Sequence, residues 1–93
     1  MMVYMPENGL FLNAIEGTGD IFLLDDREEG YVDYVYITVY EWDGDELVEF
    51  DGGMMMLTEL FDDKYGNDNR SLIKDSMEFM DYNVSDYVEI KEA

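Results

Sequence analysis

The 93-residue chain carries 24 Asp and Glu residues against 5 Lys and Arg, which gives a formal net charge of −19 at pH 7. Hydrophobic residues make up 47% of the chain, so it can bury the core of one domain and is not expected to be disordered. Because Cys and His are both absent, disulfides, mechanisms that rely on a Cys nucleophile or a His base, and the common zinc sites are excluded.

The first thirty residues contain three short apolar segments separated by turns. Residues 1–5 precede Pro6, which fits a short edge strand or a loosely held terminus. Residues 10–15 fit either one face of a helix or a short strand. Residues 21–24 form an apolar run that is most simply a short buried strand, and an acidic connection follows at residues 25–30.

The strongest structural signal is a β-hairpin over about residues 31–50. β-Branched and aromatic residues alternate on both sides of Asp43 and Gly44, a pair that favours a tight two-residue turn. With that turn, one face of the hairpin is aliphatic and belongs to the core, and the other is aromatic and acidic. The aliphatic face comprises Val35, Ile37, Val39, Val48 and Phe50. The other face comprises Tyr34, Tyr36, Thr38, Tyr40, Trp42, Leu47, Glu49 and Asp51.

Two helices and a last strand complete the predicted fold. Gly52 and Gly53 are expected to end the hairpin, and apolar residues at helical spacing predict helices at about 53–65 and 70–81. Alternation predicts a C-terminal strand at about 86–91, with Val88 and Ile90 pointing inward. Helices on one face of a small antiparallel sheet give an α+β fold, formed by a single domain that spans residues 1–93.

Two segments of the chain resemble a known group of proteins. They are Glu28-Glu29-Gly30-Tyr31-Val32-Asp33-Tyr34 and Asp51-Gly52-Gly53-Met54-Met55-Met56-Leu57. Both are similar to segments of small acidic proteins of unknown function that are carried on conjugative mobile elements of gut Firmicutes. The resemblance extends from Met1 to about Tyr65. It implies a bacterial, cytoplasmic, mobile-element context and transfers no functional residues.

Charge and hydropathy restrict the location and the partners of the protein. No apolar run approaches the 18 residues of a membrane-spanning helix, and the first residues lack the basic segment of a secretory signal, so we expect a cytoplasmic protein with no membrane partner. Direct binding to nucleic acid is disfavoured because neutralising phosphates requires clustered Lys and Arg. The expected partner is instead a basic protein surface, such as that of a nucleic-acid-binding protein.

The aromatic and acidic face of the hairpin is the main candidate for a binding surface. Carboxylates on one face of a strand repeat at roughly 6.6 Å and can imitate a row of phosphates, and rigid aromatic side chains are typical anchors of protein interfaces. The alternative is that another segment covers the aromatic side chains while the acids face water. The candidate partner-binding residues are Asp43, Asp45, Glu49, Asp51, Tyr36, Tyr40 and Trp42.

Two hypotheses about function follow, and neither involves catalysis. The first is an acidic protein that mimics nucleic acid and occupies the basic groove of a DNA-processing or defence protein; it predicts one acidic band that joins the hairpin to residues 25–29. The second is an accessory or assembly module of a mobile element, in which the charge serves solubility and the aromatic face meets another subunit. We expect no catalytic residue, no metal and no cofactor, because the chain lacks a phosphate-binding glycine loop and has little room for a cleft between two acids.

Overall fold

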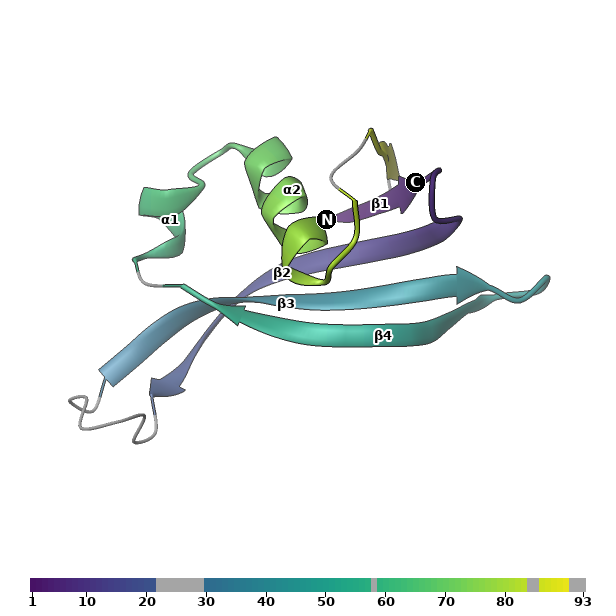
Figure 1. The fold of residues 1–93 in the computed structure, drawn as a ribbon. Helices are drawn as coiled ribbons and strands as arrows, with labels where there is room; N and C mark the ends of the chain where they lie inside the picture. The colour runs from purple at the N-terminus through teal and green to yellow at the C-terminus, as the bar shows by residue number, and fades with distance from the viewer. Residues whose placement is uncertain (22–29, 58, 84–85, 91–93) are drawn as a thin grey trace.

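The computed structural model describes residues 1–21, 30–57, 59–83 and 86–90, with the backbone alone at 18–21 and 30–32. Its elements follow the order β1 (Met2–Met5), β2 (Leu10–Ile21), β3 (Gly30–Trp42), β4 (Leu47–Met56), α1 (Phe61–Lys64), α2 (Asn69–Phe79) and β5 (Val88–Ile90) (Figure 1). The strands form one five-stranded antiparallel sheet in the order β4-β3-β2-β1-β5. The α+β fold predicted from the sequence is therefore confirmed.

The N-terminal segments belong to this sheet. Residues 10–15 lie in β2, so the strand alternative is correct for them. β1 is not an edge strand, because it pairs with β2 on one side and with β5 on the other. Ile21 is the last residue of β2, and residues 22–24 of the predicted buried strand lie outside the described part of the chain.

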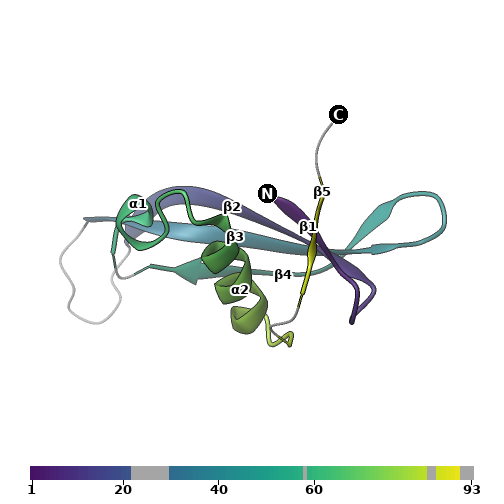
Figure 2. The same cartoon turned by 90° about the horizontal axis from the view of Figure 1, so that it is seen from above.

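Both helices lie on one face of the sheet, and the core lies between them and the strands (Figures 1 and 2). Alternation on β3 places Val35, Ile37 and Val39 on this face, where they are fully buried. Burying side chains of this size contributes roughly 1.5–3 kcal/mol each. The buried core consists of Val3, Met5, Leu12, Ala14, Val35, Ile37, Val39, Leu57, Phe61, Tyr65, Leu72, Ile73 and Met77.

α2 agrees with the predicted second helix. Its first turn is capped by Asp68, whose carboxylate accepts hydrogen bonds from the Ser71 N–H at 3.1 Å and the Ser71 hydroxyl at 2.7 Å. These bonds lower the pKa of Asp68 because they favour its charged form. Ser76 is buried among the apolar residues, and its hydroxyl donates to the Leu72 carbonyl at 2.7 Å. The buried Ser76 hydroxyl therefore has a hydrogen-bond partner.

The first helix is much shorter than predicted. β4 continues through Met56, and α1 comprises only Phe61–Lys64. Gly53 does not break the strand, because the end of α2 packs directly on it. A Cβ at Gly53 would lie 2.9 Å from the Met80 sulfur and 3.2 Å from a Phe79 ring carbon. Glycine in a strand commonly marks such a close approach, so this residue signals packing here rather than the start of a helix.

The hairpin turn differs from the predicted two-residue turn. Asp43 closes a longer loop: its N–H donates to the Glu46 carbonyl at 3.1 Å, and its carboxylate accepts from the N–H groups of Asp45 and Glu46 at 2.8 Å each. Trp42 therefore pairs with Leu47, which moves the register by two residues from the predicted one. The predicted faces survive this shift at the tip, because a shift of two preserves side-chain alternation.

A β-bulge in β4 then changes the faces. Tyr40 pairs with Glu49, but the next residue of β3, Val39, pairs with Asp51, which leaves Phe50 as the extra residue. The prediction that Val48 and Phe50 lie in the core is wrong, since both are exposed. Phe50 lies at the bulge, and Val48 lies near the tip, which projects beyond the helices (Figure 1).

The inward orientation predicted for the last strand is also wrong. Val88 pairs with Tyr4, and Ile90 pairs with Met2, so both belong to the face opposite the helices. Both side chains are exposed. Alternation identified the strand, but it left open which of the two faces would meet the core.

Candidate protein-binding surface

The face of the sheet opposite the helices, called the open face below, has no described segment packed against it (Figure 1). The strand pairings place its members in register across all five strands. They are Met2 and Tyr4 on β1, Phe11, Asn13, Ile15 and Gly17 on β2, Tyr34, Tyr36, Thr38, Tyr40 and Trp42 on β3, Leu47, Glu49, Gly52, Met54 and Met56 on β4, and Val88 and Ile90 on β5.

Large apolar side chains on the open face are exposed to solvent. The exposed fraction is 58% for Trp42, 55% for Tyr36 and 54% for Ile15, and it is 47% for both Met54 and Met56. Scattered exposed apolar residues are normal on a protein, but Ile15, Tyr36, Met54 and Met56 lie together in neighbouring strands, while Trp42 lies apart near the tip of the hairpin. Contiguous apolar patches of this kind mark interaction sites. Of the aromatic side chains of the hairpin, Tyr36 and Trp42 are exposed and Tyr34 and Tyr40 are half-buried, and no segment among the described residues covers them.

Aromatic packing holds the open face in shape. Gly17 lies directly beneath the ring of Tyr34, since a Cβ there would lie 2.5 Å from two carbon atoms of that ring. The rings of Tyr34 and Tyr36 are in edge contact with centroids 6.1 Å apart, and those of Tyr4 and Phe11 are 4.9 Å apart. Rings fixed on strands lose little conformational entropy on binding, so this surface is suited to docking.

Charged side chains are almost excluded from the open face. Among the side chains that the structure describes, Glu49 is the only charged one that the register places there. Asp51 lies on the opposite face because of the bulge. Consistent with this position, the pKa of Tyr82, which follows α2, is raised first by burial and then by the negative charge of Asp51.

The predicted partner-binding residues are thus divided among three places. Tyr36, Tyr40, Trp42 and Glu49 share the open face, as the sequence predicted. Asp51 does not join them. Asp43 and Asp45 lie in the exposed loop at the tip of the hairpin. The Asp43 carboxylate accepts hydrogen bonds from the backbone there, and these bonds lower the pKa of Asp43. The acidic residues at 25–29 that the mimic hypothesis also used lie outside the described residues.

From the sequence, Ile15, Met54 and Met56 are not placed on the open face, although all three are exposed there. The sequence predicts a helix over Met54 and Met56, because the two preceding glycines favour a break in the strand. Ile15 pairs directly with Tyr36, which in turn pairs with Met54. Three consecutive methionines carry no alternation in the sequence, so no local pattern distinguished this strand from a helix.

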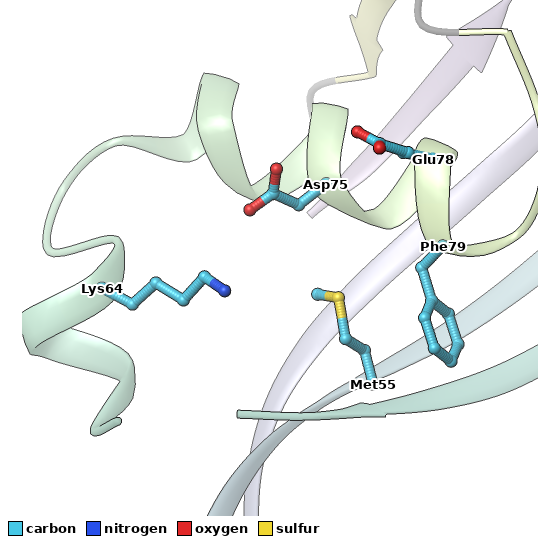
Figure 3. Close-up of a pocket in the computed structure, with 5 residues that line it drawn as sticks. All are labelled: Met55, Lys64, Asp75, Glu78 and Phe79. Carbon is cyan, nitrogen blue, oxygen red and sulfur yellow. The ribbon is translucent and has the colours of Figure 1, made fainter. Parts of the chain in front are cut away.

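The helix-covered side carries a shallow pocket of about 410 Å³, lined by Met55, Lys64, Asp75, Glu78 and Phe79 (Figure 3). The Lys64 side chain extends from α1 toward the space that Asp75 borders from α2. Asp75 already accepts a hydrogen bond from the Tyr65 hydroxyl at 3.0 Å. Burial and this carboxylate together raise the pKa of Tyr65. One cation beside two acids leaves the pocket weakly negative, which does not by itself identify a ligand.

Comparisons with known proteins add no assignment. None of the family models, curated proteins or solved structures compared with the chain matches it. Within the described residues, no three acidic side chains are grouped so that they could hold a metal ion. Neither of the two described helices is long and apolar enough to cross a membrane. The open face is therefore the feature from which we infer function.

Proposed function

We propose that this protein is a non-enzymatic binding module that docks another protein subunit on the open face of its sheet. The strongest support is the uneven distribution of charged side chains, which are abundant in the chain but almost absent from the open face. The chain has a formal charge of −19, yet the described part of the open face carries the single charge of Glu49. Depletion of charged residues together with enrichment of aromatic residues and Met is the compositional signature of an interface core.

This distribution of charge favours an assembly module over a nucleic-acid mimic. A mimic requires carboxylates and aromatic anchors along one accessible face, but the bulge places Asp51 on the opposite face from Glu49. In the proposed module, the acidic residues keep the molecule soluble despite its apolar surface. The mobile-element and cytoplasmic context implied by the sequence resemblance forms part of this proposal.

Site-specific photo-crosslinking in cells that express the protein tests the proposal. A photoreactive amino acid placed at Tyr36, on the open face, should form an adduct with another protein chain. The same amino acid at Asp62, an exposed residue of α1, is the matched control and should give little adduct. Equal adducts at the two positions, or none at Tyr36, would contradict docking on the open face.

Salt then separates the two hypotheses about function. Apolar docking on the open face should persist at high salt, because screening does not weaken burial of apolar surface. Binding through a row of carboxylates should instead weaken strongly as salt increases. The yield of the Tyr36 adduct at low and high salt provides the measurement, and loss of the adduct at high salt would favour the mimic.

A further inference from the structure

β4 is the longer of the two strands at the edges of the sheet. The sheet ends at β4 on one side and at β5 on the other, and β4 has ten residues where β5 has three. An edge strand presents backbone N–H and C=O groups that another chain can pair with, and proteins protect such edges with short strands, charges, Pro or bulges. β5 is protected by its shortness, so β4 is the edge that another chain can reach.

Only the first half of β4, toward the hairpin tip, is protected in these ways. Phe50 is the extra residue of the β-bulge, and the charged residues Glu49 and Asp51 flank it. The N–H of Gly52 donates to the Asp51 carboxylate at 2.8 Å, so that donor is already satisfied. Residues 53–56 contain no charge, no Pro and no bulge. The second half of the strand therefore lacks this protection.

The pairing with β3 shows which backbone groups of this second half point outward. The Leu57 N–H donates to the Asp33 carbonyl, and in an antiparallel ladder every second pair is bonded in this way. Met55 is therefore bonded to β3, whereas Met54 and Met56 direct their N–H and C=O groups away from it. Within the described residues these outward groups have no backbone partner. The edge thus offers two adjacent sites at which a further strand can pair.

A strand added at this edge would place one of its side chains beside the pocket of Figure 3. Side chains alternate along a strand, so the added residues opposite Met54 and Met56 would lie on the open face. The added residue between them, opposite Met55, would point toward the helices. Met55 lines the pocket there, so the free edge and the pocket adjoin.

The pocket combines apolar and acidic groups in a way that suits a long basic side chain. Phe79, which is 49% exposed, and Met55 provide apolar surface, and Asp75 and Glu78 border the same space (Figure 3). Neither acid forms an ion pair with a described cation, although Lys64 also lines the pocket. The stem of a Lys or Arg side chain packs on apolar surface while its charged end remains free to reach acids.

We propose that β4 accepts an extended segment of a basic partner protein as a sixth strand of the sheet. The segment pairs antiparallel with Met54–Met56, as the other strands of the sheet pair, and its Lys or Arg opposite Met55 enters the pocket. Main-chain hydrogen bonds supply affinity in such strand addition, and side-chain pockets supply specificity. The formal charge of −19 attracts a basic segment and repels a second copy of this chain. The inference goes beyond docking on the open face, because it concerns the edge of the sheet.

NMR titration of the isotope-labelled full chain with the capped peptide Thr-Val-Lys-Val-Thr tests the proposal. The amide signals of Met54 and Met56 should shift most. Methylating both Val nitrogens of the peptide removes the bonds to β4 and should weaken binding about tenfold or more. Methylating the Lys nitrogen, which points away from β4, is the matched control and should change binding less than about twofold. Both comparisons use the unaltered protein, so they do not depend on how a variant folds.

Charge changes in the protein test the pocket. Glu78→Lys should weaken binding of the Lys peptide about fivefold or more, because it replaces attraction by repulsion. Asp45→Lys makes the same change in the hairpin loop, roughly 30 Å along β4 from Met55 and beyond the Debye length of about 8 Å, so it should have an effect of less than about twofold. Lys64→Ala removes the competing cation and should strengthen binding. Thermal melting confirms that each variant is folded.

Four outcomes would overturn the proposal. They are peptide-induced shifts that avoid Met54 and Met56, equal weakening by the two kinds of methylation, equal effects of Glu78→Lys and Asp45→Lys, and shifts of the edge signals with protein concentration alone. The last result would show that a second copy pairs with the edge instead of a basic segment. The photo-crosslink at Tyr36 reports on the open face and is unaffected by any of these results.

Discussion

The carboxylate of Asp33, on β3, accepts a hydrogen bond from the backbone N–H of Phe61 at 2.8 Å. The backbone carbonyl of Asp33 accepts a second bond from the N–H of Leu57 at 2.9 Å. Leu60, at the start of α1, provides no side-chain cap, so a residue 28 positions earlier in the chain performs that role. Asp33 thereby holds the backbone of Leu57 and of Phe61, whose side chains both belong to the core.

Asp33→Ala should lower the free energy of unfolding by about 1–2 kcal/mol, because it removes a charge-assisted cap and leaves the Phe61 N–H without this acceptor. Urea denaturation followed by circular dichroism measures the change. Asp33→Asn retains an acceptor oxygen and should lose less. Asp62→Ala, at an exposed acid of α1, should stay within about 0.5 kcal/mol of wild type; an equal loss in both Ala variants would show that the bond from Asp33 is unimportant.

The same truncation at two isoleucines should have different effects. Ile73→Ala removes a fully buried side chain from α2 and should cost about 2–5 kcal/mol. Ile15→Ala, on the open face, should cost less than about 1 kcal/mol, because Ile15 is 54% exposed. Denaturation curves of the two variants provide the comparison. A large loss for Ile15→Ala would mean that the Ile15 side chain is covered rather than exposed.

Added salt should raise the melting temperature. The chain carries far more acids than cations, so most carboxylates repel one another, and screening reduces this repulsion more in the compact state than in the expanded unfolded state. Thermal melting in increasing NaCl measures the effect. A melting temperature that falls with salt would instead indicate that a few specific ion pairs dominate the electrostatic free energy.

Alkaline pH should destabilise the fold through Tyr65. Burial and the carboxylate of Asp75 raise the pKa of Tyr65 above its ordinary value of 10.0, so the folded state favours the neutral phenol. This contribution is fully present below pH 10.0 and is lost as the pH rises through that value toward the folded-state pKa. Melting temperatures measured across this range should fall for wild type and fall less steeply for Tyr65→Phe. Parallel curves for the two proteins would exclude Tyr65 as the cause.

The sequence predicted the fold class well because strong local patterns dominate it. On β3, the alternation of Val35, Ile37 and Val39 with Tyr36 and aromatic neighbours defined both faces correctly. The register of β4 could not be predicted in the same way. Two local sequence signals, the Asp-Gly turn and the glycine pair after Asp51, gave way to other interactions. The carboxylate of Asp43 closes a longer loop than Asp-Gly alone favours, and the approach of α2 keeps Gly53 in the sheet.

The candidate surface was predicted only in part for a related reason. Tyr36, Tyr40, Trp42 and Glu49 lie within or next to the predicted strands, so their shared face follows from alternation. The position of Asp51 depends on the single extra residue at the β-bulge, and no local sequence pattern indicates that bulge. Whether a face is covered depends on all other elements together, and this is why its exposure became known only from the structure.

The position of β1 between β2 and β5 has a consequence for the order of folding. β1 to β4 are neighbours both in the chain and in the sheet, so they can pair through short loops. The pairing of Met2 with Ile90 instead joins residues 88 positions apart, and closing so long a loop costs more entropy. β5 should therefore join the sheet last and separate from it first, so that its amides exchange with solvent deuterium faster than those at the centre of β3.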